Sequence, residues 1–178
     1  PNVEPWDPGV IALATFLVIK IAPIGKPPPK PLAIGTISGL ILELSKAKKL
    51  VKKTFADYVI FQNSGAEATE VAIKVARKYF YSIGKPNKNR ILCVKNSFHG
   101  RTIATIYASG SKKMTEGFGP KVDGFDHFNF GDHKGLKKAI SNRTAAIMVE
   151  TIMGEGGIKV IPDWCLRELR KICDKKKI

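Results

Sequence analysis

The sequence has few of the residues on which several kinds of protein depend. Its 178 residues include only 3 cysteines, 3 histidines and 2 tryptophans. An odd number of cysteines without close spacing argues against a disulfide framework and against a zinc site. The apolar run at residues 10–19 is shorter than a membrane span, and it follows acidic residues where a signal peptide is basic. These absences favour a cytoplasmic protein without a metal centre, an export signal or a membrane anchor.

Acidic residues are scarce as well. The sequence has 15 acidic and 30 basic residues, so its formal net charge is +15. A charge of this size is compatible with nucleic-acid binding. However, 24 of the bases are lysines, they fall in scattered pairs, and no aromatic residues interleave with them. A solvated basic surface is therefore favoured. A nucleic-acid-binding module stays the non-enzyme alternative, and the salt dependence of binding to heparin or duplex DNA would distinguish the two.

The composition changes near residue 45. Residues 1–45 hold 8 of the 11 prolines and have no net charge, whereas residues 46–178 carry the whole charge of +15. Such a change marks a boundary, and the proline cluster at residues 27–31 continues neither a helix nor a central strand. We therefore expect an atypical, proline-rich segment at residues 1–45, followed by one domain over residues 46–178.

Residues 46–178 alternate between patterns typical of helices and of strands. The patterns predict strands at 58–61, 90–95, 126–130 and 144–149, and helices up to residue 54 and at 66–81, 101–109, 133–141 and 163–176, with a loop from the end of the third helix to residue 124 and another after 149. This order predicts an α/β fold with a parallel, doubly wound sheet. In such a sheet, the turns that follow neighbouring strands meet at the edge where ligands bind.

The most informative turn follows the strand predicted at residues 58–61. Its small residues Ser64, Gly65 and Ala66 open a helix whose apolar residues recur at helical spacing. The first N–H groups of a helix are free and lie at the positive end of its dipole, so a phosphate could approach the backbone here. Ordinary capping of the helix explains the same residues, and the turn matches neither common glycine pattern of nucleotide sites.

The turn after the strand predicted at residues 90–95 repeats the arrangement. Phe98 offers a flat apolar face, and the planar guanidinium of Arg101 suits a carboxylate or a phosphate. Beside a phosphate cradle, an aromatic ring and an arginine suggest an enzyme of amino-acid metabolism with an aromatic cofactor that bears a phosphate.

Several spaced segments resemble the class III pyridoxal-phosphate aminotransferases; they are residues 55–57, 63–68, 72–79 and 98–102. Within that class, residues 116–120 and 149–157 are most similar to the acetylornithine aminotransferases of bacterial arginine synthesis. The resemblance runs in order from about Ser45 to the end of the chain. It implies that residues 46–178 form part of the large cofactor-binding domain of the fold-type I transferases, and that residues 1–45, which are unlike the start of the family, are not native to that fold.

The resemblance implies cofactor contacts at individual positions. Ser64, Gly65 and Ala66 would hold the phosphate of pyridoxal 5'-phosphate, and Phe98 would stack on its pyridine ring. His99, next to Phe98, is a further candidate near the cofactor.

The resemblance also implies substrate contacts. Arg101 would bind the α-carboxylate, and Glu155 would lie at the mouth of the site. Glu150 matches an acid near the cofactor, although a carboxylate bonded to the backbone at a strand end explains it equally well. Thr151 and Met153 stand where the family usually has proline and glutamine.

By resemblance, the activity would be transfer of an amino group between N-acetylornithine and 2-oxoglutarate in arginine biosynthesis. Ornithine and 4-aminobutyrate aminotransferases are the alternatives. Relatives act as homodimers on small amino acids and 2-oxo acids. The lysine that forms the Schiff base and the aspartate at the pyridine nitrogen follow the matching segment in the family. We therefore expect no catalytic residue in this chain and a fragment that is inactive alone.

Overall fold

The computed structural model describes residues 10–13, 16–19, 37–54 and 58–178, with side chains from residue 45 onward. Its centre is a parallel sheet in the order β5-β4-β6. The three strands are β4 (Arg90–Val94), β5 (Phe125–Phe128) and β6 (Thr144–Met148). The predicted α/β class with a parallel sheet is confirmed.

Helices cover both faces of this sheet because alternate residues of β4 point to opposite sides. Ile91 and Cys93 join a core with residues of α2 (Gly65–Ser82) and α3 (Ile103–Ala108). Leu92 lies in a second core with α5 (His133–Ala139) and α6 (Asp163–Lys176). The sheet is thus doubly wound, as the apolar run from Ile91 to Val94 in its central strand indicates.

A second, antiparallel sheet contains the strand that precedes α2. In this sheet β1 (Val10–Leu13) pairs with β2 (Phe16–Ile19), and β2 pairs with β3 (Tyr58–Phe61). The expectation that residues 58–61 lie in the parallel sheet is therefore wrong. Strand β2 supplies backbone partners along the whole of β3, and both β1 and β2 lie in the segment that the composition sets apart.

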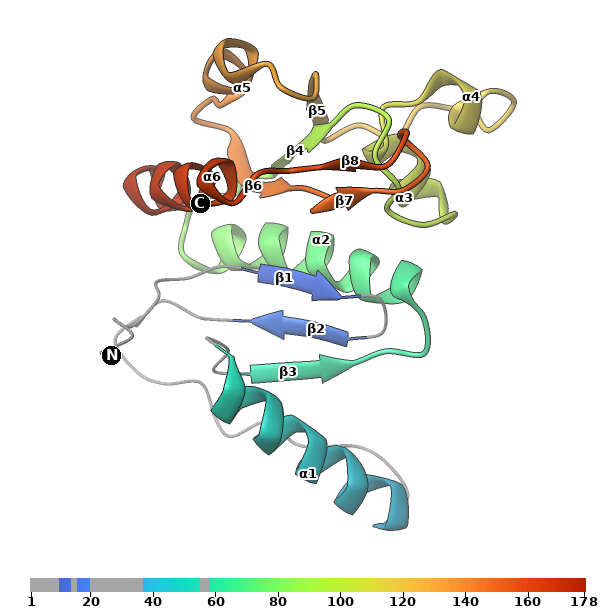
Figure 1. The fold of residues 1–178 in the computed structure, drawn as a ribbon, viewed down its shortest axis with the longest axis vertical. Coiled ribbons are helices and arrows are strands. Elements are labelled where there is room, and N and C mark those ends of the chain that lie inside the picture. The colour runs from blue at the N-terminus through green and yellow to red at the C-terminus, as the bar shows by residue number, and fades with distance from the viewer. Residues whose placement is uncertain (1–9, 14–15, 20–36, 55–57) are drawn as a thin grey trace.

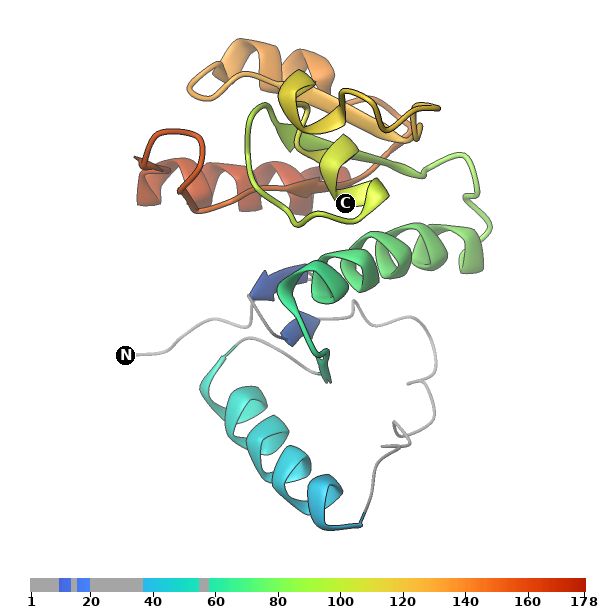
Figure 2. The same ribbon diagram turned by 90° about the vertical axis from the view of Figure 1, so that its right-hand side faces the viewer.

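Helix α2 lies between the two sheets (Figures 1 and 2). It packs against β1 and β2 on one side and against α3 and β6 on the other. On the far side of β3 is α1 (Ile37–Lys53), which contacts that strand. Among the described residues, no helix combines the length and the apolar character needed to cross a membrane.

The ends of the predicted helices and strands agree with the structure to within two residues. The start of α1 is the exception, because this helix begins at Ile37, before the domain boundary predicted near residue 45. Two short elements occur where only loops were predicted. They are the helix α4 (Lys112–Thr115) and the hairpin of β7 (Ile152–Met153) and β8 (Lys159–Val160). Strands of two residues and a helix of four residues are too short to show a periodic pattern in the sequence.

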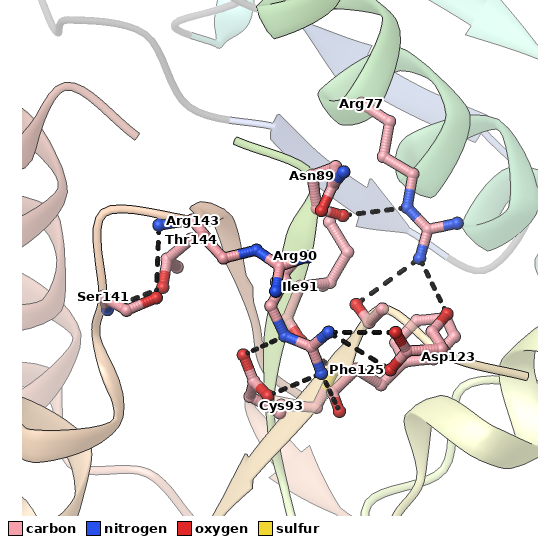
Figure 3. Close-up of polar contacts among 12 residues, drawn as sticks. Arg77, Asn89, Arg90, Ile91, Cys93, Asp123, Phe125, Ser141, Arg143 and Thr144 are labelled. Carbon is pink, nitrogen blue, oxygen red and sulfur yellow. Dashed lines mark hydrogen bonds and ion pairs between the residues drawn. The ribbon is translucent and has the colours of Figure 1, made fainter. Parts of the chain in front are cut away.

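A polar network holds the amino ends of β4 and β5 together (Figure 3). Arg90 donates from Nε and Nη2 to the two oxygens of Asp126, at 2.8 Å each, and from Nη1 to Asp123 at 3.1 Å. The hydrogen bond with Asp126 is the main cause that raises the pKa of Arg90. Arg77 of α2 donates to the carbonyl oxygen of Asn89 at 3.1 Å. This network fixes the strand register at the end of the sheet opposite the turn that follows β4.

Candidate functional site

The amino end of α2 forms the first part of the site. Ser64 is the N-cap, with an extended backbone, and its Oγ accepts a hydrogen bond from the Glu67 N–H at 3.3 Å. The same Oγ donates to Glu67 Oε2 at 3.0 Å. The capping interpretation is thus correct, and it is compatible with an anion site. The N–H groups of Gly65 and Ala66 precede the first donor with a helical acceptor, so they stay available.

The turn after β4 contacts this helix end directly, although β3 and β4 lie in different sheets. Gly100 has a φ of +122°, and a Cβ placed there would be 2.9 Å from the Ala66 Cβ. Two residues further on, the Thr102 hydroxyl donates to the carboxylate of Glu70 on α2. The two turns therefore meet as expected. They meet because α2 packs against the turn after β4. They do not meet at the edge of one shared sheet.

Phe98, Arg101 and Glu155 form the second part of the site. The Arg101 guanidinium carbon lies 5.7 Å from the centroid of the half-buried Phe98 ring. Arg101 Nη2 is 3.5 Å from Glu155 Oε1, and the two side chains are 67% and 56% exposed. An exposed ion pair of this length contributes little stability. The carboxylate of a ligand can therefore replace Glu155 on the guanidinium at low cost.

Glu150, just after β6, is bonded to backbone on both oxygens. Its Oε2 accepts the Phe98 N–H at 2.9 Å, and its Oε1 accepts the Gly154 N–H at 3.1 Å. Of the two interpretations that the sequence left open, these bonds favour the carboxylate bonded to backbone.

His99 is buried and serves as an anchor of the turn. Its Nε2 lies 2.8 Å from Ser97 Oγ, and that hydroxyl donates its proton to the Val94 carbonyl at 2.6 Å. Ser97 can then only accept from His99, so the ring proton lies on Nε2. Burial, with a smaller contribution from His127, lowers the pKa of His99 to about 4. A neutral, buried imidazole suits a structural role better than proton transfer at neutral pH.

Sequence reasoning missed the residues that hold the two turns together. Gly100, Thr102 and Glu70 do so through contacts between α2 and the β4 turn. The only local signal is the spacing of Thr102 and Thr105, since the Thr102 hydroxyl accepts the Thr105 N–H at 3.3 Å as an N-cap. Nothing local indicates Glu70, because its partner is 32 residues away.

The residues present fit a planar cofactor that bears a phosphate. Small residues leave the backbone donors of the α2 end accessible, the Phe98 ring offers a stacking face, and Arg101 adds a planar cation. The amino end of α2 thus offers hydrogen-bond donors to a phosphate. The adjoining turn after β4 offers an aromatic face to a ring and a guanidinium to a carboxylate.

Comparison with known proteins extends this interpretation. The family described as Aminotransferase class-III matches residues 40–178. The acetylornithine aminotransferase of Agrobacterium fabrum is 56% identical over 129 residues, which are 72% of this chain and 32% of that protein. The succinylornithine transaminase/acetylornithine aminotransferase of Pseudomonas aeruginosa is 46% identical over 132 residues, or 74% of this chain and 32% of that protein.

Solved structures show the same relationship. The ornithine aminotransferase of Toxoplasma gondii ME49 superimposes with a TM-score of 0.70 at 31% identity, over 75% of this chain and 32% of that one. An omega-transaminase of Thermomicrobium roseum gives a TM-score of 0.61 at 30% identity, over 66% of this chain and 31% of that one. The chain thus spans only about a third of the length of the proteins that it matches.

Proposed function

Because the chain belongs to the class-III aminotransferase family, we propose that it forms part of a pyridoxal-phosphate-dependent aminotransferase. The proposed reaction moves an amino group between N-acetylornithine and 2-oxoglutarate in arginine biosynthesis. The names of the similar proteins support N-acetylornithine as the amino donor. We place the whole enzyme in the cytoplasm as a homodimer. Ornithine and 4-aminobutyrate are the alternative amino donors.

One observation carries the proposal: the open amino end of α2 adjoins the turn that bears Phe98 and Arg101. Gly65 and Ala66 would bind the phosphate through their N–H groups, with Ser64 as the neighbouring cap. Phe98 would hold the pyridine ring. This arrangement would orient the cofactor between a fixed anion site and a fixed aromatic face.

The bound cofactor would supply the electron sink for the reaction. The residues of this chain would bind and orient. Arg101 would take the α-carboxylate in two parallel hydrogen bonds, after exchange of its weak partner Glu155. None of the residues assigned here is proposed to move the proton.

Substrate specificity tests the proposal. The full-length protein, loaded with pyridoxal phosphate, is assayed with 2-oxoglutarate and each of N-acetylornithine, ornithine and 4-aminobutyrate. We expect the highest kcat/KM with N-acetylornithine. A higher value for either other donor would replace the proposed substrate, and no transfer from any donor would overturn the proposed activity.

We also propose a boundary near residue 45. The family match begins at residue 40, which supports it. The pairing of β2 with β3 crosses this boundary, so the test is made on the coding sequence. Family-like residues in another reading frame upstream of the Ser45 codon would support a foreign segment at residues 1–45. Equal dissimilarity in all three frames would contradict it.

A further inference from the structure

Two loops of the site meet at one carboxylate. The first, here called the cofactor loop, is residues 96–100 after β4, and the second, the substrate loop, is residues 154–157 between β7 and β8. Glu150 accepts one N–H from each loop, from Phe98 at 2.9 Å and from Gly154 at 3.1 Å. Each donor lies in a loop that carries a residue assigned to the site, Phe98 in the first and Glu155 in the second.

A second contact joins the same loops without Glu150. A Cβ placed on Gly156 would lie 3.0 Å from the Asn96 carbonyl oxygen and 2.7 Å from the Met153 Cε. Met153 is only 1% exposed, so the floor beneath this contact is tightly packed. The backbone of the substrate loop therefore rests on the backbone of the cofactor loop, and a shift of one requires a shift of the other.

We propose that Glu150 is a positioning residue that couples the two loops. A change in the position of one loop would then alter both the binding of the cofactor ring and the recognition of substrate. This inference rests on the proposed function. Glu150 acts through Phe98 and Gly154, and it needs no contact of its own with cofactor or substrate. Its carboxylate would transmit the position of one loop to the other.

The chemistry of the side chain makes the coupling specific to a carboxylate. Both oxygens of Glu150 accept a charge-assisted hydrogen bond from a backbone N–H. A glutamine has the same length but only one acceptor oxygen. Its NH₂ group is a donor, so it cannot accept a hydrogen bond from the second backbone N–H. Glu150→Gln therefore breaks one bond of the pair with almost no change in volume. Glu168→Gln, at an exposed position on α6 that pairs with Lys171, removes the same charge elsewhere and serves as the matched control.

The first measurement is hydrogen exchange at the Phe98 and Gly154 amides of the full-length protein, without cofactor or substrate. We expect exchange in Glu150→Gln to be at least about tenfold faster at both amides, since one lost bond loosens both loops, and unchanged in Glu168→Gln. Unchanged exchange, or faster exchange at only one amide, would overturn the coupling. Because this readout needs no activity, it is independent of the proposed function.

The second measurement separates positioning from a general structural role. We expect Glu150→Gln to weaken pyridoxal-phosphate binding and to raise the KM for the amino donor, each about tenfold, in protein that is fully folded by circular dichroism. A lower Tm with unchanged cofactor affinity and KM would reduce Glu150 to a structural residue and overturn the proposal.

Gly156→Ala is a second variant, in case Glu150→Gln does not fold. The added methyl group pushes the substrate loop away from the Asn96 carbonyl while Glu150 stays intact. If the loops are coupled, this change on the substrate side also weakens cofactor binding. A raised KM with unchanged cofactor affinity would contradict the coupling.

Discussion

The contact between Gly100 and Ala66 allows a quantitative test of how the site is assembled. In Gly100→Ala, the new Cβ would lie 2.9 Å from the Ala66 Cβ and 3.0 Å from the Thr105 Oγ1. Ordinary contacts between carbon atoms are about 3.5–4.0 Å. Overpacking costs about 1–3 kcal/mol and a left-handed backbone about 1–2 kcal/mol, so we expect Gly100→Ala to lower the free energy of unfolding by about 2–5 kcal/mol.

Gly84→Ala is the control for backbone strain. Gly84 has a φ of +75°, and a Cβ there has no atom within 4 Å. It should therefore lose only about 1–2 kcal/mol. The midpoints of urea denaturation, followed by far-UV circular dichroism on the full-length protein, give both losses.

A double variant isolates the pair of residues. Ala66→Gly removes the methyl group that the new Cβ of Gly100→Ala would strike. The two changes together should therefore cost at least about 1 kcal/mol less than the sum of their separate effects. Equal losses in Gly100→Ala and Gly84→Ala, or no coupling in the double variant, would refute the packing of the β4 turn on the amino end of α2.

Three further predictions concern charge. Arg101→Lys keeps the charge but loses the planar fork, so kcat/KM should fall at least about tenfold for every amino donor while cofactor content stays the same. The pKa of His99 is lowered to about 4 in the folded chain. Because the unfolded chain binds that proton near pH 6.5, stability should fall by up to about 3 kcal/mol as the pH drops from about 6.5 to 4, and His99→Gln should flatten this slope in urea titrations. Asp126→Asn, which disrupts the paired bonds to Arg90, should cost about 1–2 kcal/mol, and Asp123→Asn, at a 77% exposed side chain, should cost less.

Each of these predictions has a contrary result. If Arg101→Lys loses bound cofactor but keeps normal turnover at each site that still holds cofactor, Arg101 binds the cofactor and not the substrate. An unchanged slope in His99→Gln would assign the acid sensitivity to other groups. Equal losses at Asp126 and Asp123 would show that burial of the ion pair is not what matters.

Local patterns in the sequence were sufficient for the elements around the site. The apolar spacing of residues 66–81 and the short β-branched and apolar runs at 58–61 and 90–95 predicted α2, β3 and β4 with nearly correct ends. The same patterns placed Gly65 at a helix start and Phe98 in the turn after a strand. Helical periodicity and capping depend on residues that are close in the chain, so a sequence displays them directly.

Tertiary structure alone decided how those elements meet. The pairing of β3 with β2, the hydroxyl of Thr102 on Glu70, and the bond from the Phe98 amide to Glu150 all join distant parts of the chain. The sequence pattern of a strand predicts that its backbone groups need hydrogen-bond partners. It does not predict which other strand supplies those partners. Likewise, the carboxylate of Glu150 could have faced a ligand or a backbone. Only the arrival of the Phe98 and Gly154 amides beside it decided between the two, because a hydrogen bond depends on where atoms lie in space.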